Sequence, residues 1–112
     1  MILEIRTHQL VLHPILRSKI EERVLWSLGR FAERATKVCV KLTDINGPRG
    51  GVDKHCRIEV TVRGQKPLMI EDYDAEVLPV VGKATERLRV ALARATQRVR
   101  AFKRSWIGDR RA

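Results

Sequence analysis

The sequence predicts an α+β fold, a two-layer sandwich with the order β-α-β-β-β-α in which both helices cover one face of a four-stranded sheet. Apolar and polar residues alternate on both sides of a glycine-rich loop, a pattern typical of a β-hairpin. Two longer segments, one before and one after the hairpin, repeat apolar residues every three or four positions, as amphipathic helices do. Each helix therefore has one apolar stripe and the strands have one apolar face, which favours two helices on the same side of the sheet.

The hairpin is organised around a loop at residues 44 to 57, the only segment with three glycines. Asn46-Gly47-Pro48 and Gly50-Gly51 are turn residues, because glycine reaches positive φ at little steric cost and proline fixes its own φ. Residues 37 to 45 alternate before the loop and residues 54 to 63 alternate after it. We therefore expect two antiparallel strands here.

Two further strands complete the predicted sheet. Residues 2 to 7 form a short first strand, and the helix that follows is a crossover, so the first two strands are expected to be parallel. A tight turn at residues 64 to 66 leads to a short last strand at residues 67 to 71. We place this strand at an edge, where the missing donor of Pro67 is tolerated.

The first helix is expected from Pro14 to about residue 33. Proline is favoured at the first helical position, where its N–H would be unpaired in any case, and His13 then occupies the cap position. Basic residues form a second stripe beside the apolar one, because positions four and seven apart lie close together at about 100° per residue. Trp26 lies near this stripe; stacking on a base is one interpretation, but we expect it to cover the edge of the core. The basic residues are Lys19, Arg23 and Arg30.

The second helix is expected from residue 74 to about residue 104, with caps from Asp72 and Asp74 and a disturbance of its first turns at Pro79. Its basic residues lie at steps of four, seven and four, within about 60° of one another around the axis. We expect the basic rows of the two helices to have few acidic neighbours and to merge into one positive surface. The second row comprises Lys83, Arg87, Arg94 and Arg98.

The charge of the chain indicates an anionic partner. Its 112 residues include 23 Lys and Arg against 13 Asp and Glu, a net charge of +10, and so large an imbalance in a short chain favours nucleic acid. Arginine and lysine at regular spacing match a phosphate backbone through their charge and the bidentate geometry of arginine. Arg49 in the glycine-rich loop and Lys54 at the start of the next strand are further candidate RNA contacts.

Recognition is expected through the backbone and shape of the nucleic acid rather than through stacking on bases. The chain has only two tryptophans, one tyrosine and two phenylalanines. The outward sheet residues Arg57, Glu59 and Thr61 also offer no aromatic platform of the kind that binds single-stranded bases.

Catalysis, a cofactor and a metal site are not expected. The histidines lack metal-ligand spacing, and Asp53-Lys54-His55 is interpreted as a group of polar residues that closes the hairpin. Cys39 and Cys56 fall on opposite faces of the predicted sheet, which argues against a disulfide, and two cysteines are too few for a zinc site.

The chain length favours one domain at residues 1 to 104, followed by a mobile basic tail at residues 105 to 112. The first residues lack the features of a signal peptide. No apolar run reaches the roughly 20 residues that are needed to span a bilayer. We therefore expect a cytoplasmic protein with no membrane partner.

Several segments have the order and spacing of a known family. They are Pro14-Ile-Leu-Arg17 with Ile20-Glu-Glu-Arg23, then Arg30-Phe31 and Thr36-Lys-Val38, the loop pattern Asp44…Asn46-Gly47…Arg49-Gly-Gly51…Asp53-Lys54…Cys56, and Glu86-Arg87-Leu88…Leu92…Arg94 with Arg98. Together they resemble the ribosome hibernation factors, the family of hibernation-promoting factors and ribosome-associated inhibitors that is also called the sigma-factor modulation proteins. The departures from its usual pattern are His13, Pro79 and Val90.

The resemblance implies a fold similar to double-stranded-RNA-binding domains and a non-enzymatic role in ribosome hibernation under stress. Such factors bind the small ribosomal subunit between its head and body, occupy the mRNA and tRNA positions and block translation. The chain looks like a short form of the family, without cofactor or small-molecule substrate. By this resemblance, ribosomal RNA phosphates would be contacted by Arg23, Lys83, Arg87, Arg94 and Arg98.

The residues themselves leave three other functions open. The chain fits a general double-stranded-RNA-binding protein without preference for ribosomes. It also fits a regulator that binds an acidic protein, because its net charge of +10 suits either partner. A small enzyme would have to use Asp53, Lys54 and His55.

Overall fold

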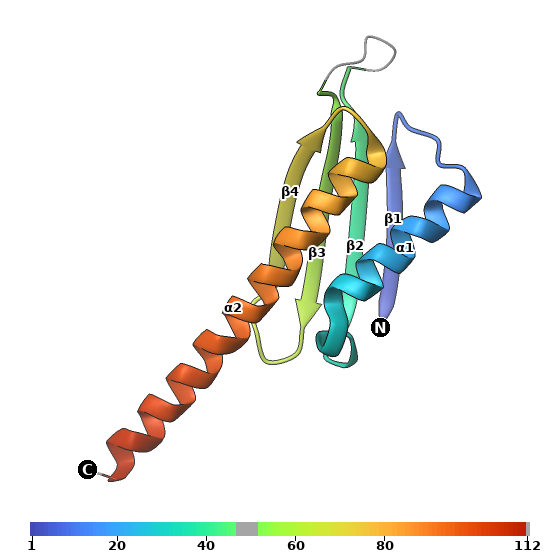
Figure 1. Cartoon of the computed structure of the whole chain (residues 1–112). Helices are drawn as coiled ribbons and strands as arrows, with labels where there is room; N and C mark the ends of the chain where they lie inside the picture. The colour runs from blue at the N-terminus through green and yellow to red at the C-terminus, as the bar shows by residue number, and fades with distance from the viewer. Residues whose placement is uncertain (47–51, 112) are drawn as a thin grey trace.

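The computed structural model describes the backbone of residues 1–46 and 52–111 and the side chains of residues 1–46 and 52–97. The elements follow in the predicted order, and the α+β fold with a four-stranded sheet and two helices is confirmed (Figure 1). They are β1 (Ile2–His8), α1 (Pro14–Leu28), the 3-10 helix η1 (Gly29–Glu33), β2 (Ala35–Asp44), β3 (Lys54–Val62), β4 (Leu68–Asp74) and α2 (Val77–Arg111).

The four strands lie in the order β1-β2-β3-β4. β1 pairs in parallel with β2, since α1 connects them as a crossover, and the remaining neighbours are antiparallel, as predicted. Leu42 lies opposite Cys56, and Ile58 lies opposite Ile70. This register places the apolar residues of the three antiparallel strands on one face.

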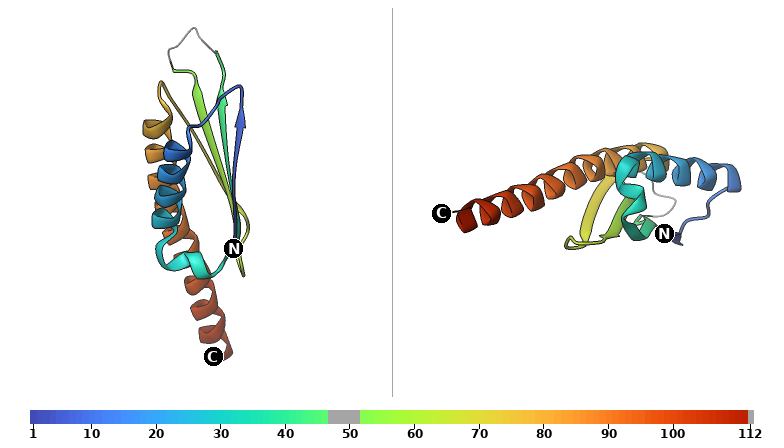
Figure 2. Two further views of the ribbon diagram at one scale, coloured as in Figure 1. Left: turned by 90° about the vertical axis from the view of Figure 1, so that its right-hand side faces the viewer. Right: turned by 90° about the horizontal axis from the view of Figure 1, so that it is seen from below.

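Both helices pack on that apolar face, and the other face of the sheet is left open (Figure 2). The core between the layers is formed by aliphatic side chains that are fully removed from solvent, and each contributes roughly 1.5–3 kcal/mol by burial. The largest contributions come from Ile20, Val24 and Leu28 of α1, from Val38, Val40, Leu42, Ile58 and Val60 of the sheet, and from Val81, Leu88 and Leu92 of α2.

Helix α1 is five residues shorter than the sequence predicts, because Gly29 ends it. Gly29 has φ 53° and ψ −127°, a conformation that side chains with a Cβ rarely adopt, and its N–H donates to the carbonyls of Leu25 and Trp26. The chain then continues as η1, which buries Phe31. At the other end, His13 does cap the helix, with Nδ1 accepting from the Ile15 N–H at 3.2 Å.

Helix α2 begins at Val77, later than predicted, because β4 extends to Asp74 through pairing of Asp74 with Lys54. Asp72 and Asp74 therefore belong to a strand, and their predicted role as caps of the second helix is wrong.

Pro79 lies in the first turn of α2, where backbone N–H groups have no partner within the helix. The backbone stays helical through residues 105–111, predicted as a tail, and extends well beyond the sheet (Figure 1).

The two cysteines lie on opposite faces of the sheet, as predicted. Cys56 is buried under the helices, and Cys39 is half-buried on the open face; neither forms a disulfide. Burial, together with the charge of Asp72, raises the pKa of the Cys56 thiol to about 12.

Within the described part of the chain, neither helix is apolar over enough of its length to cross a membrane.

Candidate nucleic-acid interface

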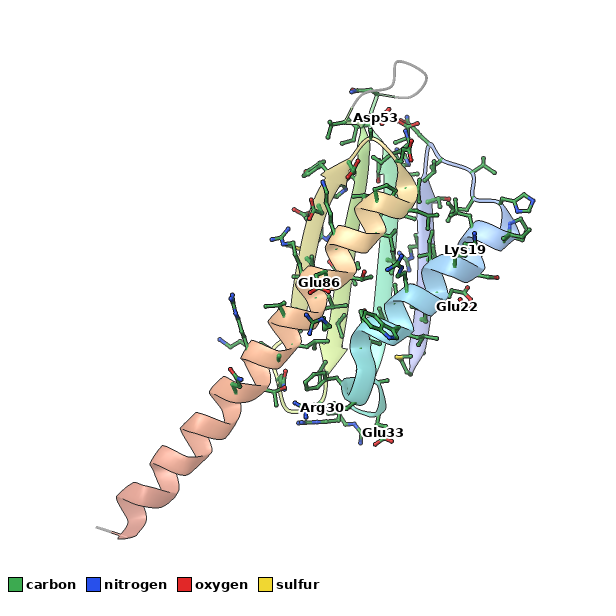
Figure 3. The ribbon with its side chains drawn as sticks, in the orientation of Figure 1. Lys19, Glu22, Arg30, Glu33, Asp53 and Glu86 are labelled. Carbon is green, nitrogen blue, oxygen red and sulfur yellow. The ribbon has the colours of Figure 1, made fainter. Side chains whose placement is uncertain are left out.

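A groove of about 600 Å³ lies between α1 and the start of α2, and it contains the basic row of α1. Lys19, Glu22, Arg23 and Trp26 line it from α1, and Leu78 lines it from α2. We call it the α1–α2 groove. Lys19 and Arg23 are exposed, and neither forms an ion pair with any described side chain. Figure 3 shows Lys19 and Glu22 on α1, away from the sheet.

The spacing of residues along α1 explains this arrangement. Ile20 and Val24 are buried against the sheet, so they fix the rotation of the helix. Lys19 comes one residue before Ile20, and Arg23 comes one residue before Val24. Their side chains therefore lie together, about 100° around the helix from the buried stripe. That side faces α2, which brings Leu78 into the same groove.

Trp26 is 70% exposed, and the prediction that it covers the edge of the core is wrong. Its position three residues after Arg23 places the indole on the same side of the helix as the two cations. Sequence reasoning missed its exposure because the rotation of α1 is fixed by contacts with the sheet, and Trp26 falls outside the buried stripe. An exposed aromatic ring therefore adjoins two cations that lack a carboxylate partner among the described residues.

The described members of the basic row of α2 lie on the other side of that helix, along β4. Lys83 Nζ donates to the Tyr73 carbonyl and lies 3.0 Å from Asp74 Oδ2. Arg87 donates to the Glu71 carbonyl and lies 3.6 Å from Asp72 Oδ2. The hydrogen bond from Lys83 holds the pKa of Asp74 below its usual value. The prediction that this row has few acidic neighbours is therefore wrong for its first two members.

Among the described residues, the two basic rows lie on different sides of α2, contrary to the prediction that they merge into one positive surface. Leu78 on one side of α2 faces α1, whereas Lys83 and Arg87 on the other side contact β4. The outward surface between them carries Glu86, which faces away from the sheet in Figure 3 and pairs with Arg89 at 2.6 Å. Arg89 lowers the pKa of Glu86 through this hydrogen bond.

The remaining predicted contacts are scattered. Arg94 is exposed and lines a second hollow of about 350 Å³ between α2 and β4, with no ion pair to a described side chain. Arg30 is exposed beyond the end of α1, with its guanidinium 5.4 Å from the centre of the Phe31 ring (Figure 3). Arg49 lies outside the described residues, and the side chain of Arg98 lies outside the described side chains.

Lys54 is engaged inside the protein. Its ammonium lies 2.9 Å from Asp53 Oδ1 and 3.5 Å from Asp44 Oδ2, and only 17% of its side chain is exposed. Asp53 is fully buried, and its pKa lies below the usual value mainly because Lys54 donates a hydrogen bond to its carboxylate. Two carboxylates already surround this lysine, which makes it a poor candidate for a phosphate contact.

Asp53, Lys54 and His55 do not converge on one site. Neighbouring strand residues point to opposite faces, so His55 lies on the open face while Lys54 turns to the other side. The His55 ring packs against Tyr73 with 4.8 Å between ring centres. Among the described residues, no group of three or more His, Cys, Asp and Glu side chains is arranged to hold a metal ion.

Two arginines of the open sheet face pair with glutamates of the same face. Arg6 pairs with Glu4 at 3.0 Å, and Arg57 pairs with Glu59 at 2.6 Å. Lys41 lies between the two arginines in the register. The two arginines of this face are thus paired within the face itself, whereas Lys19 and Arg23 of the α1–α2 groove are not.

These features define a small α+β protein with exposed basic residues on its helical layer and an open sheet face on which two arginines are ion-paired. The same fold occurs in the Protein Y N-terminal domain of Thermus thermophilus, with a TM-score of 0.68 and 18% identity over 84% of this chain and 98% of that one. It also occurs in a ribosomal subunit interface protein from Coxiella burnetii, with a TM-score of 0.71 and 14% identity over 87% of this chain and 99% of that one.

At these identities the likeness is one of fold. No protein-family model matches the sequence, and no curated protein matches it.

Proposed function

We propose that this protein is a translation-inhibiting ribosome hibernation factor that binds the small ribosomal subunit through ribosomal RNA phosphates in the mRNA and tRNA channel. The observation that carries the proposal is the pair Lys19 and Arg23, which line the α1–α2 groove without a carboxylate partner among the described side chains. The fold shared with a protein named for the ribosomal subunit interface supports the choice of partner.

We rank the proposed RNA contacts by whether a carboxylate of the protein already pairs with the cation. Lys19 and Arg23 come first, and the exposed Arg30 and Arg94 follow, because none of the four pairs with a described carboxylate. Lys83 and Arg87 contribute less, since Asp74 and Asp72 already neutralise part of their charge. The net charge of +10 attracts RNA at long range and adds to each of these contacts.

Residues 1 to 104 would form the ribosome-binding unit, and residues 105 to 112 would add basic charge to it. The protein would act in the cytoplasm, where small subunits are found, and would need no cofactor. Its effect would be steric, because a bound factor in the channel excludes mRNA and tRNA without any chemical step.

Sedimentation through sucrose gradients with purified ribosomal subunits tests the proposal. At low salt the protein should migrate with the small subunit, and rising salt should release it steeply as cations compete for the phosphates. Translation in vitro should be inhibited over the same range of protein concentration. A protein that stays at the top of the gradient at low salt would exclude this function.

A general double-stranded-RNA-binding protein is the second candidate, favoured by exposed cations that need only a phosphate backbone. Competition distinguishes the two. A simple RNA duplex in modest excess should leave the protein on the small subunit if the ribosome is the partner, and should remove it if any duplex suffices.

A further inference from the structure

We propose that the α1–α2 groove binds one unstacked nucleotide of RNA, with the base against Trp26 and the phosphates beside Lys19 and Arg23. The proposal rests on the proposed function and deepens it. In this proposal the protein recognises an unstacked RNA base in addition to the charge and shape of the RNA.

The size and lining of the groove fit such a ligand. Its volume of about 600 Å³ falls within the range of about 300–1,000 Å³ that small-molecule sites occupy. The indole of Trp26 on α1 and the side chain of Leu78 on α2 give it apolar surfaces from two different helices. Leu78 is 40% exposed, so both apolar groups remain open to a ligand.

The combination of an exposed ring with unpaired cations indicates RNA as the occupant. A flat base stacks on an aromatic side chain whatever its sequence, while its own phosphates need positive charge nearby. Arg23 lies about one helical turn before Trp26 and Lys19 about two turns before it, on the same side of α1. No described carboxylate pairs with either cation.

Glu22 sets the orientation of the nucleotide. Its carboxylate also lines the groove and repels phosphate, so the phosphates are expected on the side of Lys19 and Arg23 and away from Glu22. A base edge with hydrogen-bond donors can approach Glu22 instead. A nucleotide lying across the groove satisfies both requirements.

A regular RNA duplex cannot make this contact. Its bases are stacked on one another, and proteins read it through phosphates and 2′-hydroxyl groups. Trp26 would then stay in solvent. The proposed ligand is therefore an unpaired nucleotide in a bulge, loop or single strand, which separates this inference from binding by charge alone.

Titration of purified small ribosomal subunits with Trp26 variants is the test. Trp26→Leu keeps an apolar side chain without a ring, and it should weaken binding between about fivefold and about 150-fold, the range expected for one lost base stack. Trp26→Tyr keeps a ring and should retain most of the affinity. Equal affinity of wild-type and Trp26→Leu proteins would overturn the inference.

Tryptophan fluorescence provides a second measurement. Trp106→Phe leaves Trp26 as the only tryptophan, and a short RNA hairpin with one unpaired adenosine should quench its emission more than the same hairpin without it. Equal quenching by the two hairpins would also overturn the inference. Failure of the wild-type protein to bind small subunits at all would instead refute the proposed function, so the two failures are distinguishable.

Discussion

Lys83 Nζ lies 3.0 Å from Asp74 Oδ2, so a carboxylate of β4 already pairs with the first cation of the basic row on α2. Asp74 belongs to β4, and together with Asp72 it reduces the charge of the α2 row. On α1, Lys19 and Arg23 form no ion pair with a described side chain, although Glu22 lines the same groove. The contrast between the two rows leads to the first prediction.

Removing the two carboxylates should increase RNA affinity. In Asp72→Asn/Asp74→Asn, Lys83 and Arg87 are released to bind phosphate, and the plot of log affinity against log salt should steepen by up to about 0.9 for each additional phosphate that is neutralised. Asparagine retains the Oδ1 acceptor that holds the Ala75 N–H. The measurement is a salt titration with small subunits.

The matched control is Glu4→Gln/Glu59→Gln, which makes the same change of charge on the open sheet face. It should raise affinity much less. If both double variants bind equally tightly, the effect is one of net charge, and the local pairing of Lys83 and Arg87 is irrelevant.

The buried Asp53 should make stability depend on pH in acid. Lys54 holds its pKa in the folded protein below the ordinary 3.8. The carboxylate therefore stabilises the fold fully above that pH, and this contribution is lost as pH falls through the lower folded value. Asp53→Asn should be less stable than wild type at neutral pH in urea unfolding, and the difference should shrink well below pH 3.8. A constant difference throughout would contradict this.

The two thiols should differ in reactivity. Cys56 is buried and its pKa is raised to about 12, so almost none of it is thiolate at mildly alkaline pH, whereas Cys39 is half-buried on the open face. A thiol reagent should label one cysteine per chain in the native protein and both in urea. Loss of all native labelling in Cys39→Ser would confirm the assignment; rapid native labelling of Cys56 would refute it.

Two glycines in similar open space should respond in opposite ways to alanine. A Cβ at Gly29 or at Gly82 would meet no atom within 4 Å apart from its chain neighbours and its own helix backbone. Gly29 has φ 53° and ψ −127°, so Gly29→Ala should cost about 1–3 kcal/mol of unfolding free energy through backbone strain. Gly82 lies inside α2, and Gly82→Ala should be neutral or stabilising by up to about 1 kcal/mol. Urea unfolding of both variants measures the difference, and equal effects would contradict it.

The fold was predictable because each element carries one apolar face. Alternation around Val38 to Leu42 and around Cys56 to Val62 is enough to define two strands that are covered on one side. The ends of elements were less predictable. Gly29 stops α1 through its own dihedral angles, and Asp74 joins β4 through pairing with Lys54 in a distant strand.

The candidate site was predictable only in part. Helical spacing places Lys19 and Arg23, like Lys83 and Arg87, beside an apolar stripe, but each helix has two such sides. Which side faces the other helix depends on packing, so the separation of the two rows was not visible in the sequence. The pairing of Arg87 with Asp72 likewise joins residues of different elements.

The most direct measurement is the affinity for purified small subunits of Lys19→Gln/Arg23→Gln compared with Lys37→Gln/Lys41→Gln. The first variant removes the two cations of the α1–α2 groove, and the second removes two exposed lysines of the open sheet face. The groove variant should lose about tenfold or more in affinity and should reduce the salt slope by about two, whereas the sheet variant should lose much less. Equal losses in the two variants would contradict the assignment of RNA binding to the helical layer.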